Sequence, residues 1–149
     1  MRYLPLMKIL IGIGIVFFLI QDARADTGAA QKEPSAEALG LDQKWGITIR
    51  NVRLTAAGRM IDFRYRVVDP DRASALLQKE RKAYLVDQKT GKQLAVPTTK
   101  LGPLRQTAVK PTANRDYIIL FANTGSLVKA GDLVTIVIGD FKVENLTVE

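Results

Sequence analysis

The segment spanning residues 46–73 constrains the fold more than any other stretch, because it places a strand pattern directly before a helix start. From residue 59 to 68, Ile61, Phe63, Tyr65 and Val67 alternate with polar and basic residues. This period of two is typical of a strand with one buried face and one solvated face. We therefore expect a strand here, followed by a short helix over residues 70–78 with Asp69-Pro70 at its start.

Residues 46–55 provide the other strand of a hairpin. Ile47 and Ile49 share one face, whereas Val52 and Leu54 fall on the opposite face of a regular strand. An extra residue near Arg50-Asn51, a β-bulge, would bring all four to the same side. The turn between the two strands lies at residues 56–58, with Gly58 suited to a positive φ.

The remaining strand patterns follow at short intervals. A second hairpin is expected over residues 82–87 and 92–97, and a long loop over 98–114. The apolar run 116–122 predicts a central strand buried on both faces, and two more strands follow at 133–138 and 141–148, the last with a phase shift at Glu144-Asn145. About seven strands and one short helix predict an all-β, antiparallel β-sandwich of immunoglobulin-like type, with a small β-barrel as the alternative.

The N-terminal residues carry a targeting pattern. Residues 1–25 combine a basic start, an apolar stretch and small residues at Ala23 and Ala25, as in a secretory signal peptide. An uncleaved membrane anchor is the alternative, although the apolar run is short for a spanning helix. Residues 26–44 have the composition of a flexible leader, within which a frayed helical turn near Leu39 could dock on the domain. The β-sandwich domain would then occupy residues 45–149.

Missing residue types exclude several chemistries. The chain has no His and no Cys, so it lacks the usual general base and the imidazole and thiolate ligands of zinc and copper. Asp69 and Asp71 fit helix capping better than a calcium site. We therefore expect no enzyme, no cofactor and no metal, with an Asp- or Lys-based enzyme as the least favoured class. The formal charge of +7 comes from scattered residues, which argues against nucleic-acid binding.

Arginine is the residue type that offers a candidate site. Arg64 and Arg66 share the solvated face of the predicted strand, and the hairpin could bring Arg50 or Arg53 beside them. Guanidinium groups clustered in this way suit carboxylates and phosphates. The alternative is a solvated face in which arginines pair with Asp62. The loop 98–114 adds Arg105 as a surface candidate. The tentative binding residues are thus Arg50, Arg53, Arg64, Arg66 and Arg105.

The chain also resembles a family of small exported bacterial proteins of unknown function. The motifs that carry the resemblance are TAAGRMIDFRYRVVDPDRA, AYLVDQKTGKQLAVP, GPLRQT, YIILFANTG and KAGDLVTIVIGDFKVENLTVE. Its recurring pieces include Gly58, Asp62, Asp69-Pro70 and Asn123, and it covers residues 46–149. The resemblance implies an exported domain of immunoglobulin-like fold. It transfers no catalytic residue.

Two functions remain open for an exported domain of this kind. The first is a non-enzymatic module, periplasmic or secreted, that binds a protein partner or assists an envelope complex through edge strands or the arginines. The second is a small-molecule or anion-binding module with a pocket bordered by the loop 98–114. A flat basic face would favour the first function, and a closed apolar pocket with convergent polar groups would favour the second.

Overall fold

The computed structural model describes residues 36–149, which are built mainly of antiparallel strands, so the predicted all-β class is confirmed. The predicted signal peptide, residues 1–25, lies outside the described residues. The two α-helices in this part are α1 (Ala36–Trp45) and α2 (Pro70–Leu77). Neither is long and apolar enough to cross a membrane.

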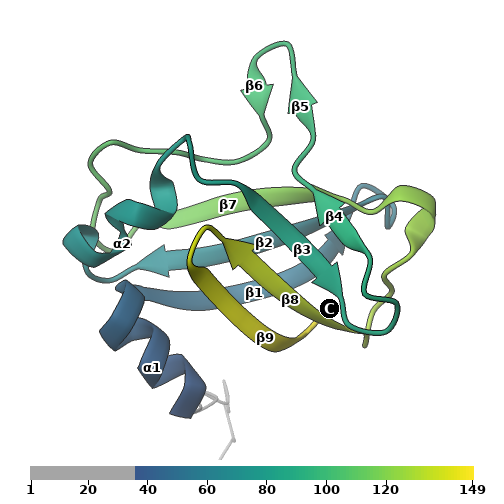
Figure 1. Ribbon diagram of the computed structural model, residues 1–149, viewed down its shortest axis with the longest axis horizontal. Coiled ribbons are helices and arrows are strands. Elements are labelled where there is room, and N and C mark those ends of the chain that lie inside the picture. Colours follow the sequence, from purple (N-terminus) through teal and green to yellow (C-terminus); the bar gives the residue numbers. More distant parts are fainter. Residues whose placement is uncertain (1–35) are drawn as a thin grey trace, which may run out of the picture. The chain divides into compact units, whose positions relative to one another are not determined.

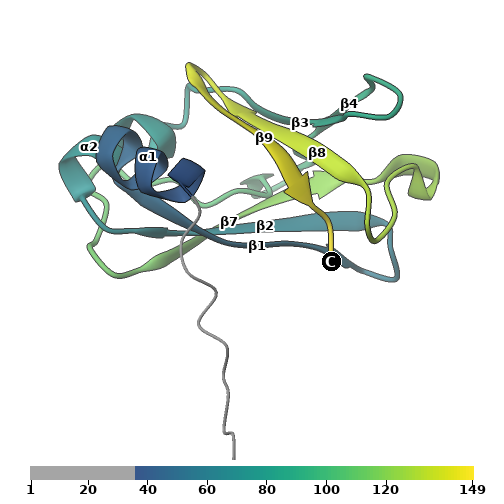
Figure 2. The same ribbon diagram turned by 90° about the horizontal axis from the view of Figure 1, so that it is seen from below.

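The strands form two larger sheets, which Figure 2 shows as two layers. The three-stranded sheet has the order β1-β2-β7, and its strands are β1 (Ile47–Thr55), β2 (Met60–Val67) and β7 (Asp116–Ala122). The four-stranded sheet has the order β4-β3-β8-β9, with β3 (Ala83–Asp87), β4 (Gln93–Ala95), β8 (Leu133–Ile138) and β9 (Phe141–Thr147). A small hairpin of β5 (Thr98–Thr99) and β6 (Gly102–Pro103) projects from these sheets (Figure 1).

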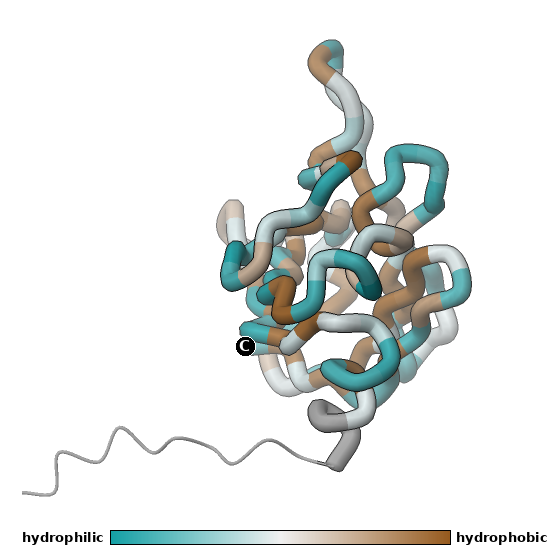
Figure 3. Tube along the Cα trace, turned by 90° about the vertical axis from the view of Figure 1, so that its left-hand side faces the viewer, coloured by the Kyte–Doolittle hydropathy of each residue, from teal (hydrophilic) through white to brown (hydrophobic). Residues whose placement is uncertain are grey.

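The core contains the inward residues of both sheets. Ile61, Phe63, Tyr65 and Val67 of β2 are fully buried, as the alternation predicted. They pack in one cluster with β8 and β9 residues such as Ile136. In Figure 3 the hydrophobic segments of the tube lie mainly between hydrophilic turns. Large buried side chains in β2 and its partners make this burial the main stabilising contribution to the fold.

Both predicted β-bulges are present. The β1–β2 register shifts between Ile49 and Asn51, which returns Val52 to the buried face. The β8–β9 register shifts between Val134 and Ile136, opposite Glu144-Asn145. A bulge adds one residue to one strand of a pair, so these polar pairs restore the inward phase of the apolar residues after them.

The predicted helix after β2 is also confirmed. Pro70 is its first residue, and the Asp69 side chain accepts hydrogen bonds from the backbone N–H groups of Asp71 and Arg72 at 3.1 and 3.2 Å. Capping of this kind satisfies donors that the first turn leaves free. The helix ends at Leu77, one residue before the predicted end, and its buried residues are Ala73, Leu76 and Leu77.

The prediction that residues 116–122 form a central strand was wrong, because β2 is central and β7 lies at one side of its sheet. The outward Ile118 and Leu120 are only half-buried. Residues 104–106 run beside β7 and supply backbone partners: Leu120 N–H donates to Leu104 O, and Gln106 N–H donates to Ile118 O, both at 2.9 Å. Part of the predicted long loop therefore acts as an additional strand along β7.

The predicted leader 26–44 is helical from Ala36 onward, which is more structure than the single turn we expected. Gly40 disfavours a helix. Contacts with the domain compensate for it: Leu41 is buried, and the Trp45 ring meets Phe141 edge to face at 5.5 Å. Thr48 Oγ1 also donates to Asp42 Oδ1 at 2.7 Å. Tertiary packing thus outweighs the local propensity.

The last residues connect the two sheets. After β9, which belongs to the four-stranded sheet, Glu149 pairs with β1 of the three-stranded sheet. Glu149 N–H donates to Val52 O and Leu54 N–H donates to Glu149 O, each at 2.8 Å. This pairing occupies part of the otherwise open edge of β1.

Candidate binding surface

The outer face of the β1–β2 hairpin brings four of the five predicted site residues together. Because Ile61, Phe63, Tyr65 and Val67 point into the core, the residues between them point outward. In the β1–β2 register Arg53 lies opposite Asp62, Asn51 opposite Arg64, and Thr48 opposite Arg66. Arg50 lies in the bulge and is exposed. We call Arg50, Arg53, Arg64 and Arg66 the arginine face.

Asp62 anchors the middle of the arginine face. Its carboxylate is almost fully buried, with a side-chain exposure of 4%. Arg53 Nη2 and Arg64 Nη2 lie 3.2 and 2.9 Å from its Oδ2 atom. Two charge-assisted contacts compensate a carboxylate that would otherwise be costly to bury. The predicted pairing of arginine with Asp62 is therefore confirmed, and both arginines stabilise the sheet.

Arg66 makes a second, more exposed ion pair. Its Nε and Nη2 donate to the two carboxylate oxygens of Asp116, directly opposite on β7, at 2.6 and 3.1 Å. The hydrogen bond from Arg66 lowers the pKa of Asp116, and the charges of Arg50 and Arg64 add to the effect. Arg50 therefore acts electrostatically on the same part of the sheet.

Replacing Arg66 with glutamine should raise the pKa of Asp116 toward its ordinary value, because the group that stabilises the carboxylate is removed. The stabilisation from this pair is full above the pKa of Asp116 in the unfolded chain and is lost as the pH falls through its lower folded pKa. A carboxyl-carbon NMR titration of both proteins measures the change. An unchanged titration midpoint of Asp116 would show that Arg66 does not lower the pKa of this carboxyl group.

The arginine face retains an excess of positive charge. Arg53 and Arg64 share one carboxylate, Arg66 has another, and Arg50 has no ion pair among the residues that the structure describes. The side chains of Arg53, Arg64 and Arg66 are 46, 36 and 37% exposed. Exposed guanidinium groups held by carboxylates lose less freedom when they bind a further anion, so the geometry suits an acidic surface.

Arg105, the fifth predicted residue, does not join the arginine face. It bridges to Ile119, an inward residue of β7, and it is half-buried rather than on the open surface. Its Nη2 donates to Leu76 O at 2.7 Å at the end of α2, and its Nη1 donates to Arg81 O. Burial lowers the pKa of its guanidinium. The partial burial of Arg105 could not be predicted from the sequence, because it depends on contacts with α2.

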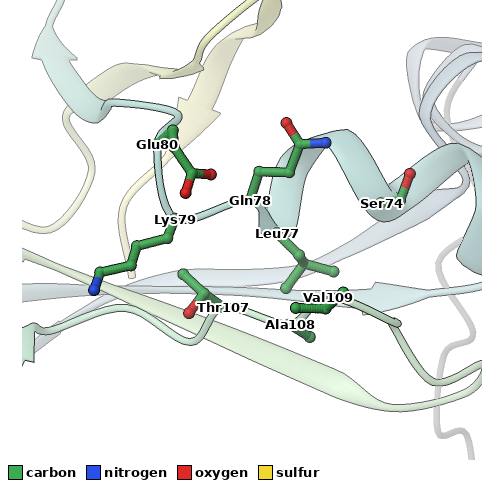
Figure 4. A pocket seen from close by; sticks show the side chains of 8 residues that line it. All are labelled: Ser74, Leu77, Gln78, Lys79, Glu80, Thr107, Ala108 and Val109. Carbon is green, nitrogen blue, oxygen red and sulfur yellow. The ribbon is translucent and has the colours of Figure 1, made fainter.

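A groove does lie beside the loop 98–114, as the small-molecule alternative requires. It has a volume of about 520 Å³ between the end of α2 and residues 107–109. Figure 4 shows Leu77 pointing toward Ala108 and Val109, with Lys79 extending along one side. Ser74, Gln78, Glu80 and Thr107 make the rest of its wall polar. It is therefore a groove of mixed polarity. The sequence predicted that the loop would border a pocket, but it could not identify the end of α2 as the other wall, because the two segments are far apart in the chain.

The described residues contain no cluster of three or more acidic, His or Cys side chains suited to hold a metal ion. Comparison with models of protein families, with curated proteins and with solved structures finds no match to this chain.

Proposed function

We propose that the chain is an exported, non-enzymatic module of immunoglobulin-like sandwich type that binds an acidic protein partner, in the periplasm or outside the cell, through the arginine face. The observation that carries this proposal is the gathering of four arginines around only two carboxylates on the outer face of one sheet. An excess of exposed guanidinium groups steers and orients an acidic partner. The targeting pattern of residues 1–25 supports export.

The sheet arrangement supports the sandwich over a closed barrel. The first, second and seventh strands form one sheet, and the third, fourth, eighth and ninth form the other. Both sheets contribute inward residues to one hydrophobic cluster, and Figure 2 shows them as separate layers. Antiparallel sheets that share a core in this manner are typical of immunoglobulin-like domains.

Reversing the charges of Arg50 and Arg66 should reduce crosslinked capture of the partner from envelope fractions by about tenfold or more. The variant Arg50→Glu with Arg66→Glu spares Arg53 and Arg64, which compensate the buried carboxylate of Asp62. Arg64→Glu would place a second carboxylate against the buried Asp62, so its effect on capture could not be separated from a loss of stability. Asp116, opposite Arg66, is 40% exposed, so water solvates both carboxylates in Arg66→Glu. Capture is quantified by mass spectrometry at two salt concentrations, since an electrostatic contact weakens with salt.

A matched control variant has the same change in total charge, but at residues outside the arginine face. Lys89→Glu with Lys92→Glu reverses two exposed charges at the turn between β3 and β4. Capture by this variant should equal that of the unchanged protein. Thermal unfolding is followed for all three proteins. Equal capture by both variants, with folding intact, would contradict a role for the arginine face.

A further inference from the structure

Arg105 is a half-buried cation whose charge is not balanced by a carboxylate. Two of its guanidinium nitrogens donate to backbone carbonyls, those of Leu76 and Arg81. Its Nε atom is buried and has no hydrogen-bond partner, and Tyr65 Oη is a second buried atom without one. Within residues 36–149 no carboxylate oxygen lies within 4.0 Å of Arg105. A carbonyl accepts a hydrogen bond but carries no net charge, so a buried cation of this kind favours a nearby anion.

A second pocket lies against Arg105 and shares Lys79 and Glu80 with the groove of Figure 4. It has a volume of about 350 Å³ and is bounded by the start of β3, the end of β4 and β6. Lys79 and Lys82 are exposed on its rim, and Glu80 is the one acidic residue that lines it. Arg81 also lines it, but Arg81 Nη1 lies 2.6 Å from Asp140 Oδ2 and is thereby neutralised.

The rest of the wall is apolar or aromatic. Tyr84 is half-buried there and is joined by Val96 and Pro103. Pockets that combine apolar walls with a few charged groups bind small organic molecules, and the charged groups orient them. The charges at this pocket are mainly positive, so the preferred orienting group is an anion.

We propose that this pocket binds a small organic anion, with a carboxylate near Arg105, Lys79 and Lys82 and an aromatic or aliphatic body against Tyr84, Val96 and Pro103. The site and its ligand class are distinct from the arginine face and its acidic partner. Binding here does not depend on the proposed function of that face, because Arg105 lies at the end of α2 and not on the outer side of the β1–β2 hairpin.

Sodium benzoate is a suitable probe, and benzyl alcohol is its neutral counterpart. The ¹⁵N-labelled protein, purified from the cells that produce it, is titrated with each compound, and the titration is followed by NMR. The Nε–H of Arg105 belongs to a residue that lines the pocket, so its signal reports on binding there. We expect benzoate to shift this signal and the Tyr84 and Val96 amides saturably. Benzyl alcohol should bind at least about fivefold more weakly.

Two variants test the role of charge without disturbing Arg105, whose loss would also free the carbonyls that it binds. Lys79→Ala with Lys82→Ala should weaken benzoate binding at least about fivefold. Lys89→Ala with Lys129→Ala removes two exposed charges that do not line the pocket, and should leave binding unchanged. Shifts that do not saturate, equal binding of benzyl alcohol, or an equal loss in both variants would overturn the proposal.

Discussion

Replacing Gly46 with alanine should lower the free energy of unfolding by about 3 kcal/mol or more. Gly46 joins α1 to β1 with a φ of +64°, and a Cβ atom there would lie 2.5 Å from Asp69 O and 2.9 Å from Arg72 Cβ. Asp69 O is a backbone atom, so it cannot move aside without shifting the start of α2. Gly46 O also accepts hydrogen bonds from the backbone N–H groups of Val68 and Asp69. A shift of Gly46 would therefore also disturb the segment between β2 and α2.

Chemical denaturation of the two proteins measures this loss, and Gly58→Ala is the matched control. Gly58 has a φ of +77°, but nothing lies within 4 Å of its Cβ position. Its replacement carries the left-handed strain alone, about 1 to 2 kcal/mol. A loss at Gly46 no larger than that at Gly58 would show that the close approach to Asp69 contributes nothing.

Replacing Asn123 with alanine should cost about 3 kcal/mol of stability. The Asn123 side chain is buried, with an exposure of 1%, and its amide is fully used. Nδ2 donates to Gly58 O at 2.8 Å and to Val128 O at 2.7 Å, and Oδ1 accepts from Val128 N–H at 3.0 Å. Alanine would leave the O and N–H of Val128 unpaired in the interior, where each carries a desolvation penalty, and would also remove the partner of Gly58 O at the partly buried turn.

The control for Asn123→Ala is the replacement of an exposed side-chain amide that makes one hydrogen bond to the backbone. Gln106 Oε1 accepts one hydrogen bond from Ile118 N–H at 3.1 Å, so Gln106→Ala should cost less than about 1 kcal/mol. Both variants are followed by denaturant unfolding monitored by circular dichroism. Losses of similar size would mean that the turn between β1 and β2 does not depend on the Asn123 amide.

The features that could be predicted from the sequence are those set by neighbouring residues. The period of two in β2, the cap at Asp69, and the polar pairs at the bulges each act within a few positions of the chain. The pairing of arginine with Asp62 also follows, because a hairpin brings the residues of its two strands opposite one another. The sequence therefore predicted that these arginines share one face, and binding through them stays a prediction.

The features that could not be predicted depend on segments distant in the chain. The run 116–122 is apolar on both faces, yet β7 is the outer strand of its sheet. Residues 104–106, a segment without a strand pattern, cover its open edge. Arg105 belongs to a loop by sequence and becomes half-buried only where α2 ends beside it. Gly40 disfavours a helix locally, and α1 persists because of tertiary contacts such as that between Trp45 and Phe141. No local pattern encodes such contacts.

The pairing of Glu149 with β1 sets the order in which the fold can be completed. β1 and β2 are neighbours in sequence and can pair early, whereas the hydrogen bonds to Val52 and Leu54 must wait for residue 149. Contacts between such distant positions close a large loop and slow folding. During that interval part of the β1 edge has no partner and can join a strand from another molecule. The backbone of Glu149 therefore covers a part of the β1 edge that would otherwise be open to a strand of another molecule.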